Sequence, residues 1–311
     1  MTLRQKAALA ALVTALALPG CAGGDRGSAA PPATAGLADV SGLAWVQDTT
    51  FLVVHDAKAD GLPRASLVSL PASAAGPGVQ ALTVAWPQPH PPASDLESIA
   101  RIPGTASFLL AESGSARRAG TPLQRLFLAD YNDGRLAITQ VVNWPVPVEN
   151  VEGTAVARIG ERLVFLFAER AEGQPQTLLR WAEMTLQPLA FGPFREVAFA
   201  APAPTGRYAR PVSAIDIDDA GRIYVAAAID TGNDHGPFRS VIWRIGRIEA
   251  DAAGQPAVVL DAQPVRLATL DGVKVEGIAV RPQPGGAPEL FFGTDDERHG
   301  GIVRLVPAEG V

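Results

Sequence analysis

The chain has 311 residues, of which 26 are basic, 32 are acidic and one is a cysteine. This acidic balance argues against a nucleic-acid partner, which would require a basic patch, and it is compatible with a cation or a cationic ligand. A single cysteine excludes an internal disulfide and any metal site built from several cysteines.

The first 20 residues have the pattern of a lipoprotein signal peptide and are not expected to belong to the fold. Arg4 and Lys6 form a basic start, and residues 7–18 are an apolar run too short for a stable membrane anchor. The run ends in L-P-G-C, which resembles a bacterial lipoprotein signal in which Cys21 receives the lipid. The alternative is an ordinary secretory peptide that is cleaved nearby, with Cys21 incidental.

Residues 21–36 are rich in glycine, alanine and proline and are predicted to form a flexible tether. Residues 37–311 follow as one domain, which is large enough for a sizeable core. No second apolar run approaches transmembrane length, so we expect contact with the membrane through the lipid only. Ala22 stands where an aspartate would favour inner-membrane retention, and this predicts a periplasmic protein held at the outer membrane.

One short phrase recurs five times through this domain. It reads D-V-S-G-L-A at residues 39–44, D-L-E-S-I-A at 95–100, N-V-E-G-T-A at 150–155, P-V-S-A-I-D at 211–216 and K-V-E-G-I-A at 274–279. Successive phrases start 56, 55, 61 and 63 residues apart. A period of this length is typical of repeat architectures.

The same succession of predicted strands follows each phrase. The second strand is apolar and ends in an acidic residue, at residues 51–56, 108–112, 164–169, 223–230 and 290–295. Third strands are predicted at 66–70, 125–129, 178–182, 241–245 and 302–306, and more polar fourth strands at, for example, 82–86, 138–144 and 265–270. Four antiparallel strands repeated around a circle define a β-propeller, so the predicted fold is all-β with five four-stranded blades.

The fifth repeat ends near residue 306 and lacks a fourth strand of its own. The segment before Asp39 is the candidate to supply this strand and to close the ring. A propeller of six blades is the less favoured alternative, because a sixth, degenerate blade has little sequence to come from.

Acidic residues are predicted to gather on one face of the propeller. The innermost strand of a blade is antiparallel to the second strand, so the start of the first lies beside the end of the second. The third position of the phrase is acidic in three blades, as Glu97, Glu152 and Glu276. The second strand ends in an acid in all five blades, as Asp56, Glu112, Glu169, Asp230 and Asp295.

Carboxylates that converge on the central axis repel one another unless a cation or an arginine neutralises them. Their hard oxygen ligands suit calcium or magnesium rather than zinc or copper. We therefore expect Glu97, Glu152 and Glu276 to bind a divalent cation. The alternative is that the acids of this face are ordinary turn residues or form bonds between blades.

Basic residues near the same strand ends are further candidates for this face, namely His55, Arg170, His235, Arg298 and His299. A lone loop histidine is more often exposed to solvent than catalytic, and His90, which lies between prolines, is interpreted as structural. The sequence contains no G-x-S-x-G elbow, zinc-binding helix or phosphate loop, so no catalytic residue is assigned.

The phrases D-L-E-S-I-A, N-V-E-G-T-A and V-E-G-I-A resemble the repeated D-x-E-G-I-A phrase of phytase-like, or esterase-like, β-propeller proteins. They are also similar to phrases of the related SdiA-regulated envelope proteins, and the opening S-G-L-A-W fits the first blade of such families. The resemblance implies an envelope propeller with calcium bound on the acidic face, and Glu97, Glu152 and Glu276 as the phrase carboxylates. The chain departs from the pattern at Ser98 and at residues 213–214, and six blades would be more usual.

These observations favour a lipid-anchored propeller whose acidic face binds a divalent cation and, through it, a phosphorylated or otherwise anionic small molecule. As an enzyme it would be a metal-assisted, phytase-like phosphoester hydrolase, in which the cation holds the phosphate and activates water. The alternative is a non-catalytic envelope protein that binds a ligand or another envelope protein, which the fold alone does not exclude. A third hypothesis is a propeller dehydrogenase with a quinone cofactor, which the absorbance of bound cofactor would decide.

Lipidation is tested at Cys21. Radioactive palmitate should label the wild-type protein and should no longer label a Cys21→Ser variant, because the substitution removes the only thiol that can accept the lipid. A wild-type protein that takes up no label would instead be secreted without an anchor.

Overall fold

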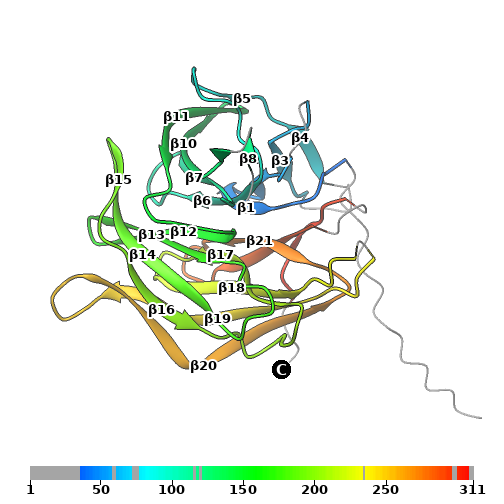
Figure 1. Cartoon of the computed structure of the whole chain (residues 1–311), viewed down its shortest axis with the longest axis vertical. Coiled ribbons are helices and arrows are strands. Elements are labelled where there is room, and N and C mark those ends of the chain that lie inside the picture. Colours follow the sequence, from blue (N-terminus) through cyan, green and yellow to red (C-terminus); the bar gives the residue numbers. More distant parts are fainter. Residues whose placement is uncertain are drawn as a thin grey trace, which may run out of the picture.

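Five β-sheets follow one another around a common axis in the computed structural model of the chain (Figure 1). The structure describes residues 36–57, 61–71, 77–114, 117–118, 121–233, 235–295 and 300–307. The predicted signal peptide, the lipidation site Cys21 and the candidates Arg298 and His299 lie outside these residues. Within them, no helix is long and apolar enough to cross a membrane.

Each sheet is one blade of antiparallel strands that are counted outward from the axis. Blade 1 contains β1 (Gly42–Gln47), β2 (Thr50–Val54), β3 (Ala65–Ser69) and β4 (Gly78–Ala81). Blade 2 contains β6 (Leu96–Arg101), β7 (Ser107–Glu112), β10 (Arg125–Asn132) and β11 (Arg135–Asn143), and between β7 and β10 the chain forms a short hairpin of β8 (Arg117–Arg118) and β9 (Thr121–Pro122).

The remaining three blades repeat this order with longer outer strands. Blade 3 contains β12 (Val151–Ile159), β13 (Arg162–Glu169), β14 (Thr177–Leu186), β15 (Leu189–Phe191) and β16 (Arg195–Phe199). Blade 4 contains β17 (Ala209–Ile217), β18 (Arg222–Ile229), β19 (Arg239–Ala250) and β20 (Pro256–Asp271), and blade 5 contains β21 (Val275–Arg281), β22 (Glu289–Thr294) and β23 (Val303–Leu305). The innermost strands contact one another in sequence, and β1 contacts both β6 and β21, so the ring is closed. The predicted five-bladed, all-β propeller is confirmed.

The outer edge of blade 1 differs from the prediction. Its fourth strand is β4, and the prediction that residues 82–86 form the fourth strand of this blade is wrong. β5 (Val84–Ala85) leaves blade 1 and pairs in parallel with β11 at the outer edge of blade 2. Trp86 follows it and packs on Phe127 of blade 2, with 5.3 Å between ring centroids. Burial of this tryptophan against the neighbouring blade thus overrides the repeat pattern.

Closure of the ring also differs from the prediction, because blade 5 has three strands among the described residues. Residues 37–40 do not form a strand beside it. The Val40 N–H donates to Thr294 O (3.0 Å) and the Gly301 N–H donates to Leu37 O (3.1 Å), so the segment lies beside the end of β22 and the residues that precede β23. Leu37 and Val40 are buried in the apolar cluster between blades 5 and 1. Closure therefore relies on apolar packing and not on an outer strand.

The hydrophobic core is divided into five buried clusters, one between each pair of neighbouring blades. Successive side chains of a strand point to opposite faces of its sheet. In β13, Val164 and Leu166 pack against blade 4, whereas Phe165 and Phe167 pack against blade 2. A strand buried on both faces is apolar at nearly every position, which explains the uninterrupted apolar runs of the second strands.

The phrase glycines lie where the innermost strands of neighbouring blades approach most closely. A Cβ atom on Gly153 would lie 2.9 Å from the backbone nitrogen of Ile215 in blade 4. Gly42 and Gly277 meet the backbones of their neighbouring blades in the same way, at 2.9 and 3.1 Å. Because interiors are close-packed, no side chain fits in these gaps. Close packing at the axis therefore explains why the repeated phrase contains glycine.

Gly153→Ala should destabilise the propeller by about 1–3 kcal/mol, because the added methyl group overpacks the contact between blades 3 and 4. The matched control is Gly78→Ala on the edge strand β4, where no atom lies within 4 Å of the added Cβ. Urea unfolding of both variants measures the difference. Equal stability of Gly153→Ala and wild type would contradict the packing role of the phrase glycine.

Candidate functional site

The three phrase glutamates lie on the top face, which is the face where the innermost strands begin and the second strands end. In β12 the register shifts by one residue at Glu152, which is left out of the ladder. The same shift leaves out Glu97 in β6 and Glu276 in β21. Each glutamate is thus the extra residue of a β-bulge, a feature that re-aims a side chain and is frequent beside functional sites.

Arg210, at the start of β17, joins acids of three different blades. Its Nη1 lies 2.7 Å from Glu276 Oε1 and 3.6 Å from Glu152 Oε2, and its Nη2 lies 2.5 Å from Asp230 Oδ2. The side chain is 3% exposed. Sequence analysis did not identify this arginine, although it directly precedes the one phrase that begins with proline and has Ser213 in the glutamate position.

Lys274 and Arg170 complete this ion-pair network. Lys274 Nζ lies 2.9 Å from Asp295 Oδ2, 3.3 Å from Asp230 Oδ2 and 3.4 Å from Glu276 Oε1. Arg170, a predicted basic candidate, donates from Nε to Glu152 Oε1 at 2.5 Å. Lys274 was also missed, because its only signal is an unusual first residue of the phrase. We use the name cationic sector for Arg170, Arg210 and Lys274 with four of the acids they contact, Glu152, Asp230, Glu276 and Asp295. Arg210 Nε also lies 3.6 Å from Glu172, whose side chain is 40% exposed.

The pKa values in the cationic sector reflect a balance between burial and charge. Burial acts to raise the pKa of Asp230, but Arg210 and Lys274 together hold it below its ordinary value. The pKa of Glu276 is raised well above its ordinary value, first by burial and then by the negative charge of Asp295. The cations therefore compensate this sector in part, and they do so most fully at Asp230.

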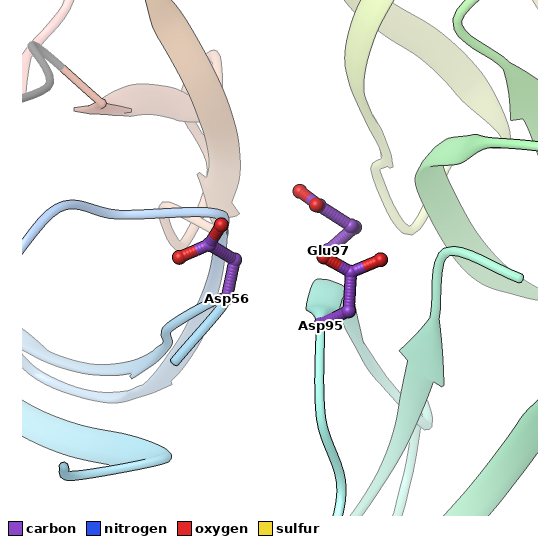
Figure 2. Close-up of side chains that lie close together, drawn as sticks. All are labelled: Asp56, Asp95 and Glu97. Carbon is purple, nitrogen blue, oxygen red and sulfur yellow. The ribbon is translucent and has the colours of Figure 1, made fainter. Parts of the chain in front are cut away.

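A second group of acids lies between blades 1 and 2. Figure 2 shows Asp56 from the end of β2 opposite Asp95 and Glu97 from the start of β6. One carboxylate oxygen of each residue lies within 4.8 Å of those of the others. Asp95 is buried, has a left-handed backbone (φ 67°) and accepts a hydrogen bond from Ser113 Oγ. We name these three residues the acidic triad.

Glu97 has the least compensated charge of the triad. Its side chain makes no hydrogen bond and no ion pair with the described part of the chain, although the residue is only 7% exposed. Burial raises the pKa of Glu97 well above its ordinary value, and the charges of Glu152, Glu276, Asp95 and Asp56 raise it further. A cation would reverse this effect, because it favours the ionised carboxylate.

Two of the predicted strand-end acids have structural partners outside both groups. Glu112 is fully buried, receives two bonds from the Arg125 guanidinium at 2.5 and 2.9 Å, and accepts the Ser94 N–H at 3.1 Å. Glu169 accepts the Glu149 N–H at 2.7 Å. The structure therefore brings Asp56, Asp230 and Asp295 together with the phrase glutamates but keeps Glu112 and Glu169 apart from them.

The two described histidines of the predicted face, His55 and His235, lie in different surroundings. His55 is buried, with Nδ1 2.7 Å from Asp39 O and Nε2 2.8 Å from Ser66 Oγ. Burial lowers the pKa of His55, so the ring is neutral near pH 7 and holds the loop after β2 in place. His235 is exposed in the turn that follows β18.

The fold and the site together define a five-bladed β-propeller with buried carboxylates at one end of its axis, some paired with cations and three grouped apart. No protein-family model matches the sequence, and no curated protein matches it.

Solved structures share the propeller fold at low sequence identity. An endo-arabinase from Bacteroides thetaiotaomicron VPI-5482 is 10% identical, with a TM-score of 0.53 over 91% of this chain and 99% of that one. A thermostable family-43 glycoside hydrolase is also 10% identical, with a TM-score of 0.51 over 90% of this chain and 94% of the other. Similarity at this level establishes the fold alone.

Arg210→Met should destabilise the protein by about 3–5 kcal/mol at pH 7, because it leaves buried carboxylates without their shared counter-charge. The loss should shrink at pH 4, where protonation removes those charges. Arg162→Met is the control, since its ion pair with Glu183 is exposed (42% for each side chain) and should contribute less than about 1 kcal/mol. Similar unfolding free energies for the two variants would contradict a structural role for the cationic sector.

Proposed function

We propose that this protein binds a divalent cation, with calcium as the expected ion, at the acidic triad of Asp56, Asp95 and Glu97. The observation that carries the proposal is the approach of their carboxylate oxygens to within 4.8 Å of one another, with Glu97 buried and outside any ion pair of the described residues. A shared cation relieves the repulsion among carboxylates held this closely.

The donor atoms favour calcium. Carboxylate oxygens are hard ligands, and calcium accepts about six to eight of them in a flexible geometry, whereas magnesium requires a near-ideal octahedron and retains several waters. Three side chains would fill part of the calcium shell and leave positions for water and for an anionic ligand. The resemblance to phytase-like propellers, which implies calcium on the acidic face, points to the same ion.

This ligand set differs from the sequence-based hypothesis, which joined Glu97 to Glu152 and Glu276. That hypothesis stays a prediction. The contacts favour the triad instead, because the other two glutamates lie against arginine and lysine side chains that would repel a metal ion.

Arg170 supports recognition of an anionic ligand beside the cation. Its side chain is 25% exposed, and burial acts to lower its pKa, but the negative charges of Glu152, Glu276 and Glu97 raise it. A phosphorylated small molecule would engage this guanidinium. When bound, the cation would supply Lewis-acid activation of a phosphoester and of water, so a phytase-like phosphoester hydrolase is the catalytic form of the proposal.

The rival function is a non-catalytic envelope protein that binds a ligand or another envelope protein at the same face. The cationic sector favours it, because Arg210 and Lys274 are each only 2–3% exposed and are fully engaged in joining acids of blades 3, 4 and 5. In both forms the protein would be anchored to the outer membrane by lipid at Cys21.

Calcium should raise the melting temperature, and Glu97→Gln should abolish this rise. An ion that binds only the folded state stabilises it by about 2.7 kcal/mol at a hundredfold excess over its Kd. In the presence of a chelator, Glu97→Gln should be neutral or stabilising, because the amide removes a carboxylate whose charge is disfavoured by burial and by the neighbouring acids. Glu183→Gln is the control, since this glutamate is exposed and pairs with Arg162.

The pH dependence of the calcium effect follows from the raised pKa of Glu97. The cation must displace a proton, so stabilisation by calcium should be complete above the raised pKa and should be lost as the pH falls through it. A calcium effect that persists in Glu97→Gln would contradict the triad as the site.

Hydrolysis and binding are separated by assaying a panel of phosphoesters with calcium and with a chelator. Calcium-dependent release of phosphate that Arg170→Gln weakens would support the hydrolase. Calcium binding without turnover of any phosphoester would support the binding protein.

A further inference from the structure

A pocket of about 180 Å³ lies on the bottom face, at the opposite end of the axis from the triad. It is bounded by the ends of β1 and β6 and by the turns that join β17 to β18 and β21 to β22. Its walls include Trp45, Val156, Ile217 and Val280, and five charged residues line it, namely Arg101, Asp216, Asp218, Asp219 and Arg222. None of these residues belongs to the top-face site.

Arg101 supplies a fixed positive charge whose donors are available to the pocket. Its guanidinium stacks over the Trp45 ring at 4.7 Å, and the Trp45 indole is held in turn by a bond from Nε1 to Asp48 O at 3.1 Å. Within the described residues, the guanidinium donates no hydrogen bond. A stacked guanidinium presents its planar fork edge-on, which is the geometry that binds a carboxylate through two parallel bonds.

Asp216 supplies a fixed carboxylate on another wall. Its Oδ1 accepts the Ile217 N–H at 2.8 Å and its Oδ2 accepts the Val280 N–H at 2.7 Å, so its position is set by the backbones of blades 4 and 5. Burial raises the pKa of Asp216 to about 7, although both backbone bonds and the charge of Arg101 lower it. Each carboxylate oxygen retains capacity to accept a further hydrogen bond.

Arg101 and Asp216 carry opposite charges and line the same pocket, but they do not form an ion pair with each other. Arg101 is near enough to affect the pKa of Asp216, yet no ion pair joins them in the described structure. The other charges at the pocket are largely satisfied or exposed: Arg222 bonds Asp218 at 2.6 Å, and Asp219 is exposed. The turn between β21 and β22 contributes only Gln283, glycine and prolines. A molecule that carries both charges would fill this gap.

We propose that the bottom-face pocket binds a small zwitterion, an α-amino acid with a short apolar side chain, with its carboxylate on Arg101, its ammonium group toward Asp216 and its side chain against Val156 and Val280. The charges of such a ligand complement the pocket at both ends. This site is independent of the cation proposed for the top face.

Isothermal titration of the full-length protein with L-valine at pH 8 tests the proposal. L-valine should bind at least about tenfold more tightly than acetate or methylamine, because each of these carries only one of the two charges. Arg101→Gln and Asp216→Asn should each weaken binding by at least about tenfold. Arg207→Gln is the matched control and should leave binding unchanged, since Arg207 stacks over Tyr208 at 5.2 Å in the exposed loop before β17.

The affinity for L-valine should fall as the pH is lowered through about 7, because protonation of Asp216 removes the partner of the ammonium group. The comparison of L-valine with acetate and methylamine uses wild-type protein only, so it holds even if a variant fails to fold. Absence of valine binding would overturn the proposal. Equally tight binding of acetate would also overturn it, since the pocket would then be an anion site that depends on Arg101 alone.

Discussion

The five innermost strands converge on one axis, and the short distances between neighbouring strands determine which residues fit there and which charges lie together. Phrase glycines stand where a Cβ would come within 2.9–3.1 Å of the neighbouring backbone. The same convergence draws Glu97, Glu152 and Glu276 toward a common centre, where burial removes the water that would otherwise screen their charges. Negative charge gathered in this way has to be protonated, paired with side-chain cations or shared with a bound ion.

Different parts of the ring accommodate this negative charge in different ways. Blades 3, 4 and 5 place Arg170, Arg210 and Lys274 among their acids, which fixes the carboxylates and ties the blades together. Blades 1 and 2 place Asp56, Asp95 and Glu97 side by side instead. One end of the axis is therefore electrostatically uneven, with side-chain cations among the acids of blades 3, 4 and 5 and grouped carboxylates between blades 1 and 2. This unevenness is what distinguishes the site from a uniformly acidic ring.

The sequence was sufficient to predict the five blades, the second strands and the strand-end acids, because a repeated packing requirement leaves a repeated pattern. The sequence was not sufficient to predict which of these acids lie together in the structure. Bulges at the phrase glutamates change side-chain direction without changing residue type. Arg210 lies outside the phrase, and Asp95 and Lys274 occupy its first position, where residue identity varies and no periodicity marks a role. β5 was misplaced because two residues of strand carry almost no local signal.

The crossing of β5 from blade 1 to blade 2 also affects how the protein opens. The backbone of β5 pairs with β11, so the chain that leaves the outer edge of blade 1 is paired to the outer edge of blade 2. Native proteins open in cooperative units that are set by such shared contacts. Separation of blade 1 from blade 2 therefore requires that the pairing of β5 with β11 break. Blade 5 is likewise joined to blade 1, through the segment at residues 37–40, which bonds to Thr294 and Gly301. We therefore expect local opening in native-state hydrogen exchange to couple neighbouring blades at both of these junctions.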